Sequence, residues 1–274
     1  MIKAISWNIA HRPVLWNDVL ALDADVALLQ EAPEPPQEIA AKTKTDLQPW
    51  RTEGGSTKCN WRAAVVKLDS RVQATWHETK PISDADGGEF AVSRLGTLSA
   101  ATITAPGEEP IIFISMYSRW ESLHASTTKA WIYADASAHR LISDLSVFIG
   151  TQKRHRIIAA GDLNILHGYG EHGSPYWGDR YQTIFDRFSA LGLRFVGPQS
   201  PNGRQAKPWP KELPKGSMNV PTFRTNQQSI AAATRQLDFV FASTGIADQV
   251  RVRALNEADE WGKSDHCRVA IEVG

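Results

Sequence analysis

Several apolar segments of this sequence end in residues that could bind a metal ion, hold a phosphate or move a proton. The clearest is Ile157-Ile158-Ala159-Ala160-Gly161-Asp162-Leu163-Asn164, a strand-like run that closes with a glycine, a carboxylate and an amide. A strand that ends this way delivers polar groups to the edge of a sheet. Taken alone, Gly-Asp-x-Asn is also an ordinary turn sequence. Its interpretation therefore depends on the other segments.

Three further segments end in the same manner. Segment 2–8 finishes at Asn8, segment 25–31 finishes at Gln30 and Glu31, and segment 111–117 finishes at Tyr117. Each residue alone fits a turn or a solvated loop. Chance is a poor explanation for all of them together.

The C-terminal part adds a carboxylate that needs a partner. Asp238 interrupts an apolar run of leucine, phenylalanine and valine, where an unpaired charge would be expensive. Ser264, Asp265 and His266 precede a last strand-like segment, 268–273. A histidine is a natural partner for Asp238.

The ordered set of these residues resembles the endonuclease/exonuclease/phosphatase superfamily, which includes deoxyribonuclease I and the exonuclease III type of apurinic endonuclease. The set runs from Asn8 to His266, so the resemblance covers nearly the whole chain. It implies a metal-dependent phosphoesterase on a four-layer α/β sandwich, in which two packed mixed β-sheets are covered by helices. The site is expected at one end of the two sheets.

The resemblance also implies a metal site. Glu31 is expected to be the principal ligand, and Asn8 and Asp265 are expected to complete or orient the metal shell. Carboxylate and amide oxygens suit Mg²⁺, with Mn²⁺ as a possible substitute. The set has no cysteine and histidine cluster, which argues against structural zinc.

The proton-transfer groups follow from the same resemblance. Asp238 is placed behind His266, where it would fix the tautomer of the imidazole. A charged His266 would hold a phosphate oxygen and a neutral one would accept a proton from water, and both remain open. Asp162 is the candidate that orients or deprotonates the attacking water, and Asn164 is expected to donate a hydrogen bond to the phosphate.

Three residues bear on the substrate. Exonuclease III-like members carry a tyrosine where this chain has Tyr117, and the upstream histidine of the Asn-x-His pattern found in deoxyribonuclease I is missing here. The site is therefore predicted to be closer to exonuclease III, with Tyr117 touching phosphate or assisting the leaving group. Arg119 could bind phosphate bidentately or serve at the surface. Trp261, four residues before Asp265, is a candidate for stacking on nucleobases.

The leading prediction is a Mg²⁺-dependent nuclease that acts on DNA in preference to RNA. One alternative is a phosphatase or phosphodiesterase of a small phosphorylated metabolite or lipid head group. The other is a catalytically silent binding module on the same scaffold. The sequence indicates no protein partner.

Composition agrees with a single domain over residues 1–274. Hydrophobic residues make up 42% and charged residues 22%, as in ordinary globular proteins. The start has no signal-peptide pattern and no run is long enough to span a bilayer, so we expect a cytoplasmic protein without a membrane partner. A formal net charge of zero excludes a grossly basic nucleic-acid binder. Stretch 198–225 is nevertheless basic and rich in proline, which predicts a long ordered loop that holds a phosphate backbone or is a solvated excursion.

Helical spacing of apolar residues predicts helices at 131–149 and 181–191, each followed by a glycine. Further strands are expected at 63–66, 90–92 and 98–103, partly antiparallel because their connections are short. Cys267 is expected to pack as a small apolar residue, and with Cys59 it suggests no disulfide framework.

Overall fold

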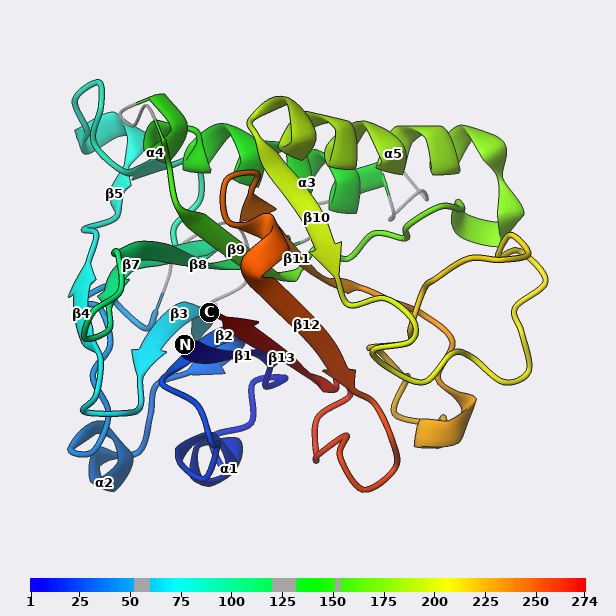
Figure 1. The fold of residues 1–274 in the computed structure, drawn as a ribbon, viewed down its shortest axis with the longest axis horizontal. Coiled ribbons are helices and arrows are strands. Elements are labelled where there is room, and N and C mark those ends of the chain that lie inside the picture. The colour runs from blue at the N-terminus through cyan, green and yellow to red at the C-terminus, as the bar shows by residue number, and fades with distance from the viewer. Residues whose placement is uncertain (52–59, 120–131, 151–153) are drawn as a thin grey trace.

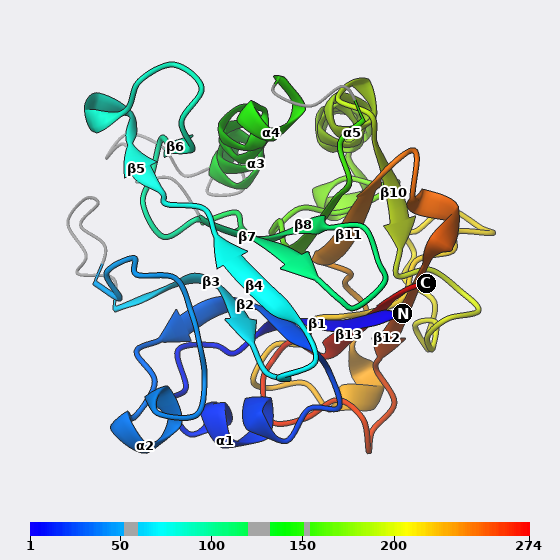
Figure 2. The same cartoon turned by 60° about the vertical axis from the view of Figure 1, so that its left-hand side comes forward.

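The computed structural model describes residues 1–51, 60–119, 132–150 and 154–274. Two β-sheets lie face to face in the middle of the molecule, and helices cover the outer face of each sheet (Figure 1, Figure 2). Figure 2 shows the four layers in order, with α1 and α2 below one sheet and α3 and α5 above the other. The four-layer α/β sandwich predicted from the sequence is confirmed.

The first sheet has five strands and contains both ends of the chain. Their order is β12 (Val250–Leu255), β13 (Arg268–Val273), β1 (Ile2–Asn8), β2 (Val26–Pro33) and β3 (Trp61–Lys67). β1 and β2 are parallel, whereas the other neighbours are antiparallel, so this sheet is mixed.

The second sheet has six strands. Their order is β10 (Leu193–Gly197), β11 (Asp238–Ser243), β9 (Ile157–Asp162), β8 (Ile111–Tyr117), β7 (Leu98–Thr104) and β4 (Gln73–Trp76). Only β8 and β9 run parallel. The central strands read as nearly continuous apolar runs because both of their faces are covered. A small parallel pair, β5 (Lys80–Pro81) and β6 (Ala91–Val92), lies outside both sheets.

The predicted helices exist, with different bounds. The outer layers contain α1 (Leu15–Leu20), α2 (Gln37–Ala40), α3 (Ile132–Leu145), α4 (Val147–Gly150) and α5 (Pro175–Ala190). The helix expected at 131–149 is divided into α3 and α4, and its first residue, Trp131, lies outside the described part of the chain. The second helix, α5, starts at Pro175 and not at Tyr181, which is six residues earlier than predicted. Pro175 at its first turn is a favourable helix start that the apolar periodicity did not reveal.

Short 3₁₀ turns in the described connections are η1 (Ile82–Asp84), η2 (Glu171–Gly173), η3 (Ile230–Ala232) and η4 (Ala247–Gln249). The predicted strands at 63–66, 90–92 and 98–103 are found as β3, β6 and β7. The antiparallel pairing expected for the shorter connections holds for β7 with β8.

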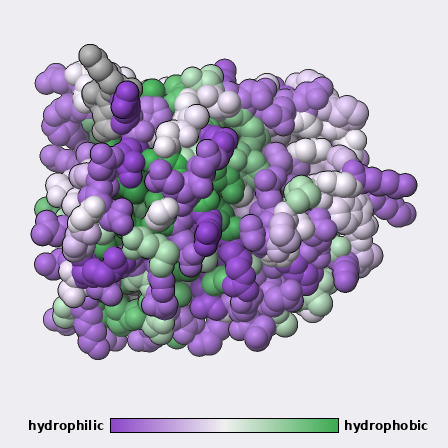
Figure 3. Space-filling model, viewed as in Figure 1, coloured by the Kyte–Doolittle hydropathy of each residue, from purple (hydrophilic) through white to green (hydrophobic). Residues whose placement is uncertain are grey.

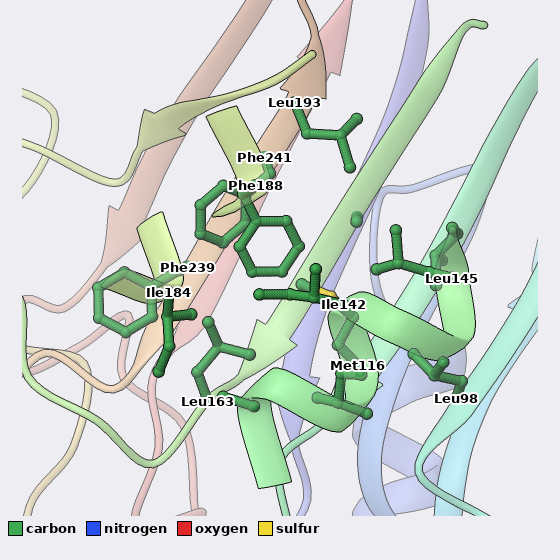
Figure 4. Packing of buried hydrophobic residues seen from close by; sticks show 14 of the residues in the cluster. Leu98, Met116, Ile142, Leu145, Leu163, Ile184, Phe188, Leu193, Phe239 and Phe241 are labelled. Carbon is green, nitrogen blue, oxygen red and sulfur yellow. The ribbon is translucent and has the colours of Figure 1, made fainter. Parts of the chain in front are cut away.

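Apolar side chains form separate layers of core. One layer fills the space between the two sheets, a second lies under α1 and α2, and a third lies under α3 and α5. In the third layer, Phe188 of α5 stacks on Phe241 of β11 with ring centroids 3.9 Å apart, and Ile142 of α3 lies beside them (Figure 4). Both sheets are thereby held rigidly, which fixes where their strand ends meet.

The face of the molecule seen in Figure 3 is mostly hydrophilic around its rim, and hydrophobic side chains are visible mainly in its middle. In the described segments, no helix combines the length and the apolar character needed to cross a membrane. The cytoplasmic location stays a prediction.

Candidate active site

Strand register brings the polar strand ends to one end of both sheets. Asp162 at the end of β9 lies opposite Asp238 at the start of β11, and Tyr117 at the end of β8 lies beside Asp162. In the other sheet, Asn8 at the end of β1 pairs with the residue before Glu31 in β2. Because the sheets pack face to face, residues from both sheets reach the same place.

The backbone around these residues adopts conformations that ordinary residues avoid. His11, Glu31 and Asn164 have φ angles of 58°, 48° and 52°, in the left-handed region. Gly161 has a φ of 154°, and a Cβ there would lie 1.8 Å from the carbonyl oxygen of Met116. Backbone strain of about 1–3 kcal/mol per residue persists where the surroundings enforce it, often at functional sites.

Asp162 is at the centre of the site and is fully buried. Its carboxylate accepts hydrogen bonds from Asn8 Nδ2 at 3.0 Å and from the backbone and side chain of Asn164 at 2.9 and 3.2 Å. Burial raises the pKa of Asp162, and the neighbouring carboxylates of Asp238 and Glu31 raise it further against the opposing charge of His266. A carboxylate with a raised pKa is a better proton acceptor than an ordinary aspartate.

His266 is held between two carboxylates. Its Nδ1 lies 2.8 Å from Oδ2 of Asp238, which confirms the predicted pairing, and its Nε2 lies 3.8 Å from Oδ2 of Asp162. Burial alone would lower the pKa of His266, but the charges of Asp238 and Asp162 and the hydrogen bond to Asp238 raise it. The surroundings therefore favour the charged imidazolium, between the two forms that the sequence left open.

The loop 198–225, which the sequence marked only by its basic residues, supports the pair of Asp238 and His266. The hydroxyl of Thr222 accepts hydrogen bonds from the backbone N–H groups of Leu237 and Asp238, at 3.0 and 3.1 Å. The ring of Phe223 lies 5.0 Å from the His266 ring. Thr222 and Phe223 thus hold Asp238 and His266 in place, and no motif in the sequence marked them.

Glu31, the expected metal ligand, interacts with the side chains of His11, Asn8 and Tyr117, which come from other segments. Its Oε2 contacts Nε2 of His11. Burial opposes the charged form of Glu31, but the hydrogen bond and charge of His11 outweigh it and lower the pKa of Glu31. Burial raises the pKa of Tyr117 well above its ordinary value, as do the charges of Glu31 and Asp162 and a hydrogen bond to Glu31. Tyr117 is therefore a phenol, and a hydrogen-bond donor, at neutral pH.

The other two expected ligands, Asn8 and Asp265, carry side-chain oxygen atoms that accept hydrogen bonds in the structure. Oδ1 of Asn8 accepts a hydrogen bond from the backbone of Ala10 at 2.9 Å, and Oδ1 of Asp265 accepts one from the Ser264 hydroxyl at 3.2 Å. Within the described residues, no three side chains of histidine, cysteine, aspartate or glutamate form a ready-made metal cage. An ionised Glu31 with few companions fits a cation such as Mg²⁺, which keeps most of its waters.

The Asn164 amide is already engaged. Its Nδ2 donates to the carbonyl oxygen of Ser118 at 3.3 Å and to Asp162 at 3.2 Å. Its role as a phosphate donor stays a prediction. Arg119 lies just after Tyr117, with its guanidinium carbon 5.9 Å from the ring centroid of Trp61. Arg119 is half-buried, and its charge acts on Tyr117. Its role in phosphate binding stays a prediction.

Trp261 does not fit the role expected from the sequence. It is fully buried, its Nε1 donates to the carbonyl oxygen of Ser264 at 3.1 Å, and it packs with Val220 and Cys267. Its ring therefore supports the segment that carries Asp265 and is closed to a nucleobase. Cys267 is buried among apolar atoms as predicted, and burial raises the pKa of its thiol. Cys59 lies outside the described residues.

The basic stretch 198–225 is an ordered loop, as predicted, and forms the yellow excursion in Figure 1. Lys207, Lys211 and Lys215 are exposed on it. Arg204 and Arg224 instead donate to the carbonyl oxygens of Ile230 and Gln228, both at 3.0 Å. The arginines stabilise the loop, and the lysines supply its exposed charge.

No model of a known protein family matches the sequence, and no curated protein matches it. Solved structures do match in fold. An AP endonuclease from Archaeoglobus fulgidus has a TM-score of 0.64 at 16% identity, covering 100% of this chain and 99% of that one. The AP endonuclease LMAP from Leishmania major has a TM-score of 0.61 at 15% identity, covering 98% and 86%.

The endonuclease domain of TRAS1, a telomere-specific non-LTR retrotransposon, gives a TM-score of 0.60 at 14% identity, covering 100% of this chain and 98% of that one. The two mixed sheets and their covering helices agree with the fold of these structures. The chain has a deoxyribonuclease I-like fold, as its residues predicted.

Proposed function

We propose that this protein is a Mg²⁺-dependent phosphodiesterase that hydrolyses nucleic acid, DNA in preference to RNA. The observation that carries the proposal is the meeting of His266 and Asp162. Asp162 ends β9 of one sheet and His266 lies just before β13 of the other, and His266 Nε2 lies 3.8 Å from Asp162 Oδ2 while Asp238 holds Nδ1. This arrangement offers a cationic hydrogen-bond donor and a proton acceptor to one reacting group.

The residues divide the work of phosphodiester hydrolysis. Asp162 orients the attacking water and takes its proton, and imidazolium His266 holds a nonbridging phosphate oxygen. Tyr117, whose phenol stays protonated, donates to the phosphate or to the leaving oxygen. Asn164 turns an amide hydrogen to the phosphate as charge develops. A cation held by Glu31, with Asn8 and Asp265, would neutralise charge on the phosphoryl oxygens.

Nucleic acid is favoured as the substrate for two reasons. Exposed Lys207, Lys211 and Lys215 lie on one loop, and such residues can follow a phosphate backbone. The structures similar in fold include AP endonucleases and a 3′ phosphatase from Neisseria bound to a product DNA hairpin, which has a TM-score of 0.56 at 17% identity. Half-buried Arg119 is the proposed phosphate contact near Tyr117.

The test is a substrate panel of plasmid DNA, single-stranded DNA, RNA and phosphorylated metabolites. We expect plasmid nicking with Mg²⁺, or with Mn²⁺ in its place, and none with EDTA. His266→Ala and Asp162→Asn should each slow hydrolysis by about a hundredfold or more. The exposed residues His172 and Asp179 supply matched controls, His172→Ala and Asp179→Asn, which should behave as wild type.

The panel also separates the other two functions. If every nucleic acid stays intact while a phosphorylated metabolite is cleaved, the nuclease assignment is wrong and the phosphatase alternative is right. Binding of nucleic acid without hydrolysis of any phosphoester would identify a silent binding module.

A further inference from the structure

His11 is tied to the expected metal ligand at two points. Its backbone N–H donates to the carbonyl oxygen of Glu31 at 3.0 Å, and its Nε2 contacts Oε2 of the same residue. His11 lies in the loop after β1, whereas Glu31 lies near the end of β2. A histidine that served only as a loop residue would not be expected to contact Glu31 through both its backbone and its side chain.

The imidazole of His11 is also held in orientation. Its ring stacks on Trp61 at the start of β3, with centroids 3.7 Å apart and an angle of 25° between the planes. Ala10, His11 and Glu31 all have left-handed φ angles, of 50°, 58° and 48°. Enforced strain at neighbouring residues, together with a stacked ring, indicates a position that is kept for function rather than for stability.

Chemistry then decides what the imidazole can do. The His11 side chain is 41% exposed, so its ring edge is open to solvent and to solutes. Imidazole nitrogen is a good ligand for transition metals, whereas carboxylate and water oxygens suit Mg²⁺ and Mn²⁺. A cation held by the Glu31 carboxylate would be within reach of His11 Nε2, because that nitrogen contacts the same carboxylate.

We propose that His11 belongs to the cation site, where its Nε2 supplies a nitrogen ligand beside Glu31 and makes the site prefer Mn²⁺ to Mg²⁺. The proposal rests on the metal dependence of the proposed function. Trp61 is then a positioning residue, because it holds the ring in plane. Asn8 would still contribute an oxygen, and water or substrate would fill the remaining positions.

The experiment measures cation binding directly, so activity is not needed. Metal-free full-length protein is titrated with Mn²⁺ and followed by electron paramagnetic resonance, Mg²⁺ is added as a competitor, and spin-echo modulation reports ¹⁴N coupled to bound Mn²⁺. The test variant is His11→Phe, which keeps a ring to stack on Trp61 but has no nitrogen. His172→Phe is the matched control, because His172 is an exposed histidine with a φ of 54°.

We expect His11→Phe to lose ¹⁴N coupling and to bind Mn²⁺ at least about tenfold more weakly, with a smaller change for Mg²⁺. His172→Phe should match wild type. Should His11→Phe not fold, His11→Asn serves instead, since asparagine tolerates left-handed backbone, and the same loss is expected. Retained coupling, or tighter Mn²⁺ binding in the variant, would overturn the proposal, the latter because the imidazole would then compete with the cation for Glu31.

Glu31→Gln separates this proposal from the one on which it rests. If wild type binds no cation, or if Glu31→Gln binds Mn²⁺ as wild type does, the metal site of the proposed function is wrong. If Glu31→Gln abolishes binding and His11→Phe leaves both affinities and the coupling unchanged, only the role of His11 is wrong.

Discussion

The side-chain amide of Asn8 donates a hydrogen bond of 3.0 Å to Oδ2 of Asp162, and this bond joins the end of β1 in one sheet to the end of β9 in the other. Both side chains are buried. Buried polar groups must find partners inside the protein, so this pair fixes how the two sheet ends meet. Asn8 was predicted as a metal ligand, and in the structure it also orients the carboxylate proposed to activate water.

Asn8→Ala should therefore lower the free energy of unfolding by about 1–3 kcal/mol, because the buried Asp162 carboxylate loses a donor. Denaturant unfolding measures the loss. Asn202→Ala, which alters an exposed asparagine, is the control and should unfold as wild type. Equal stability of Asn8→Ala and wild type would show that the bond does not hold the sheets together.

Thr222→Val should destabilise the protein by about 1–3 kcal/mol, because two buried N–H groups, those of Leu237 and Asp238, lose their acceptor. Turnover should also fall, since Asp238 orients His266. Thr222→Ser keeps the hydroxyl and should restore both properties. Thr225→Val, at an exposed position in the same loop, should change neither. Normal turnover in folded Thr222→Val would remove Thr222 from the support of the site.

Gly161→Ala should destabilise the protein by about 3 kcal/mol or more, because the new Cβ meets the Met116 carbonyl at 1.8 Å and φ is 154°. Thermal unfolding measures the change. Gly245→Ala is the matched control, since its Cβ would meet nothing within 4 Å. A melting temperature equal to that of wild type would contradict the close approach of β8 to Gly161.

His167 should make the protein sensitive to mild acid. Its ring packs against Phe185 and Phe195, with centroids 4.5 and 4.8 Å away, and its Nδ1 lies 3.0 Å from Oδ1 of Asn219. Burial lowers the pKa of His167, only partly offset by that hydrogen bond. Below pH about 6.5 the His167 imidazole is protonated in the unfolded chain but stays neutral in the folded protein. The free energy of unfolding therefore falls as the pH falls through this window.

Urea unfolding between pH 7.5 and 5.5 tests this sign. His167→Gln should lose less stability on acidification than wild type does, whereas His172→Gln, at an exposed site, should lose as much. Burial also lowers the pKa of His77, His139 and His155. Wild type and both variants contain these three histidines, so their contribution to the acid response is the same in each protein. An identical acid response in His167→Gln and wild type would assign the effect to those residues.

The sequence by itself determined the layers of the fold and named most of the candidate site residues that the strand ends bring together. Apolar runs that end in Asn8, Glu31, Tyr117 and Asp162 are strands covered on both faces. A strand buried on both faces has apolar residues at nearly every position, so the sequence reveals it directly. The pairing of Asp238 with a histidine also followed from sequence, because a carboxylate inside an apolar strand requires a partner.

Only the tertiary structure decided which loop residues join the site. Trp261 lies near Asp265 in sequence, but its ring is buried. His11 and Trp61 are far apart in sequence, yet their rings stack on each other beside Glu31. Thr222 and Phe223 reach Asp238 and His266 through backbone pairing with distant segments. Loop positions carry no periodicity, so their contacts depend on where the packed sheets place the ends of each loop.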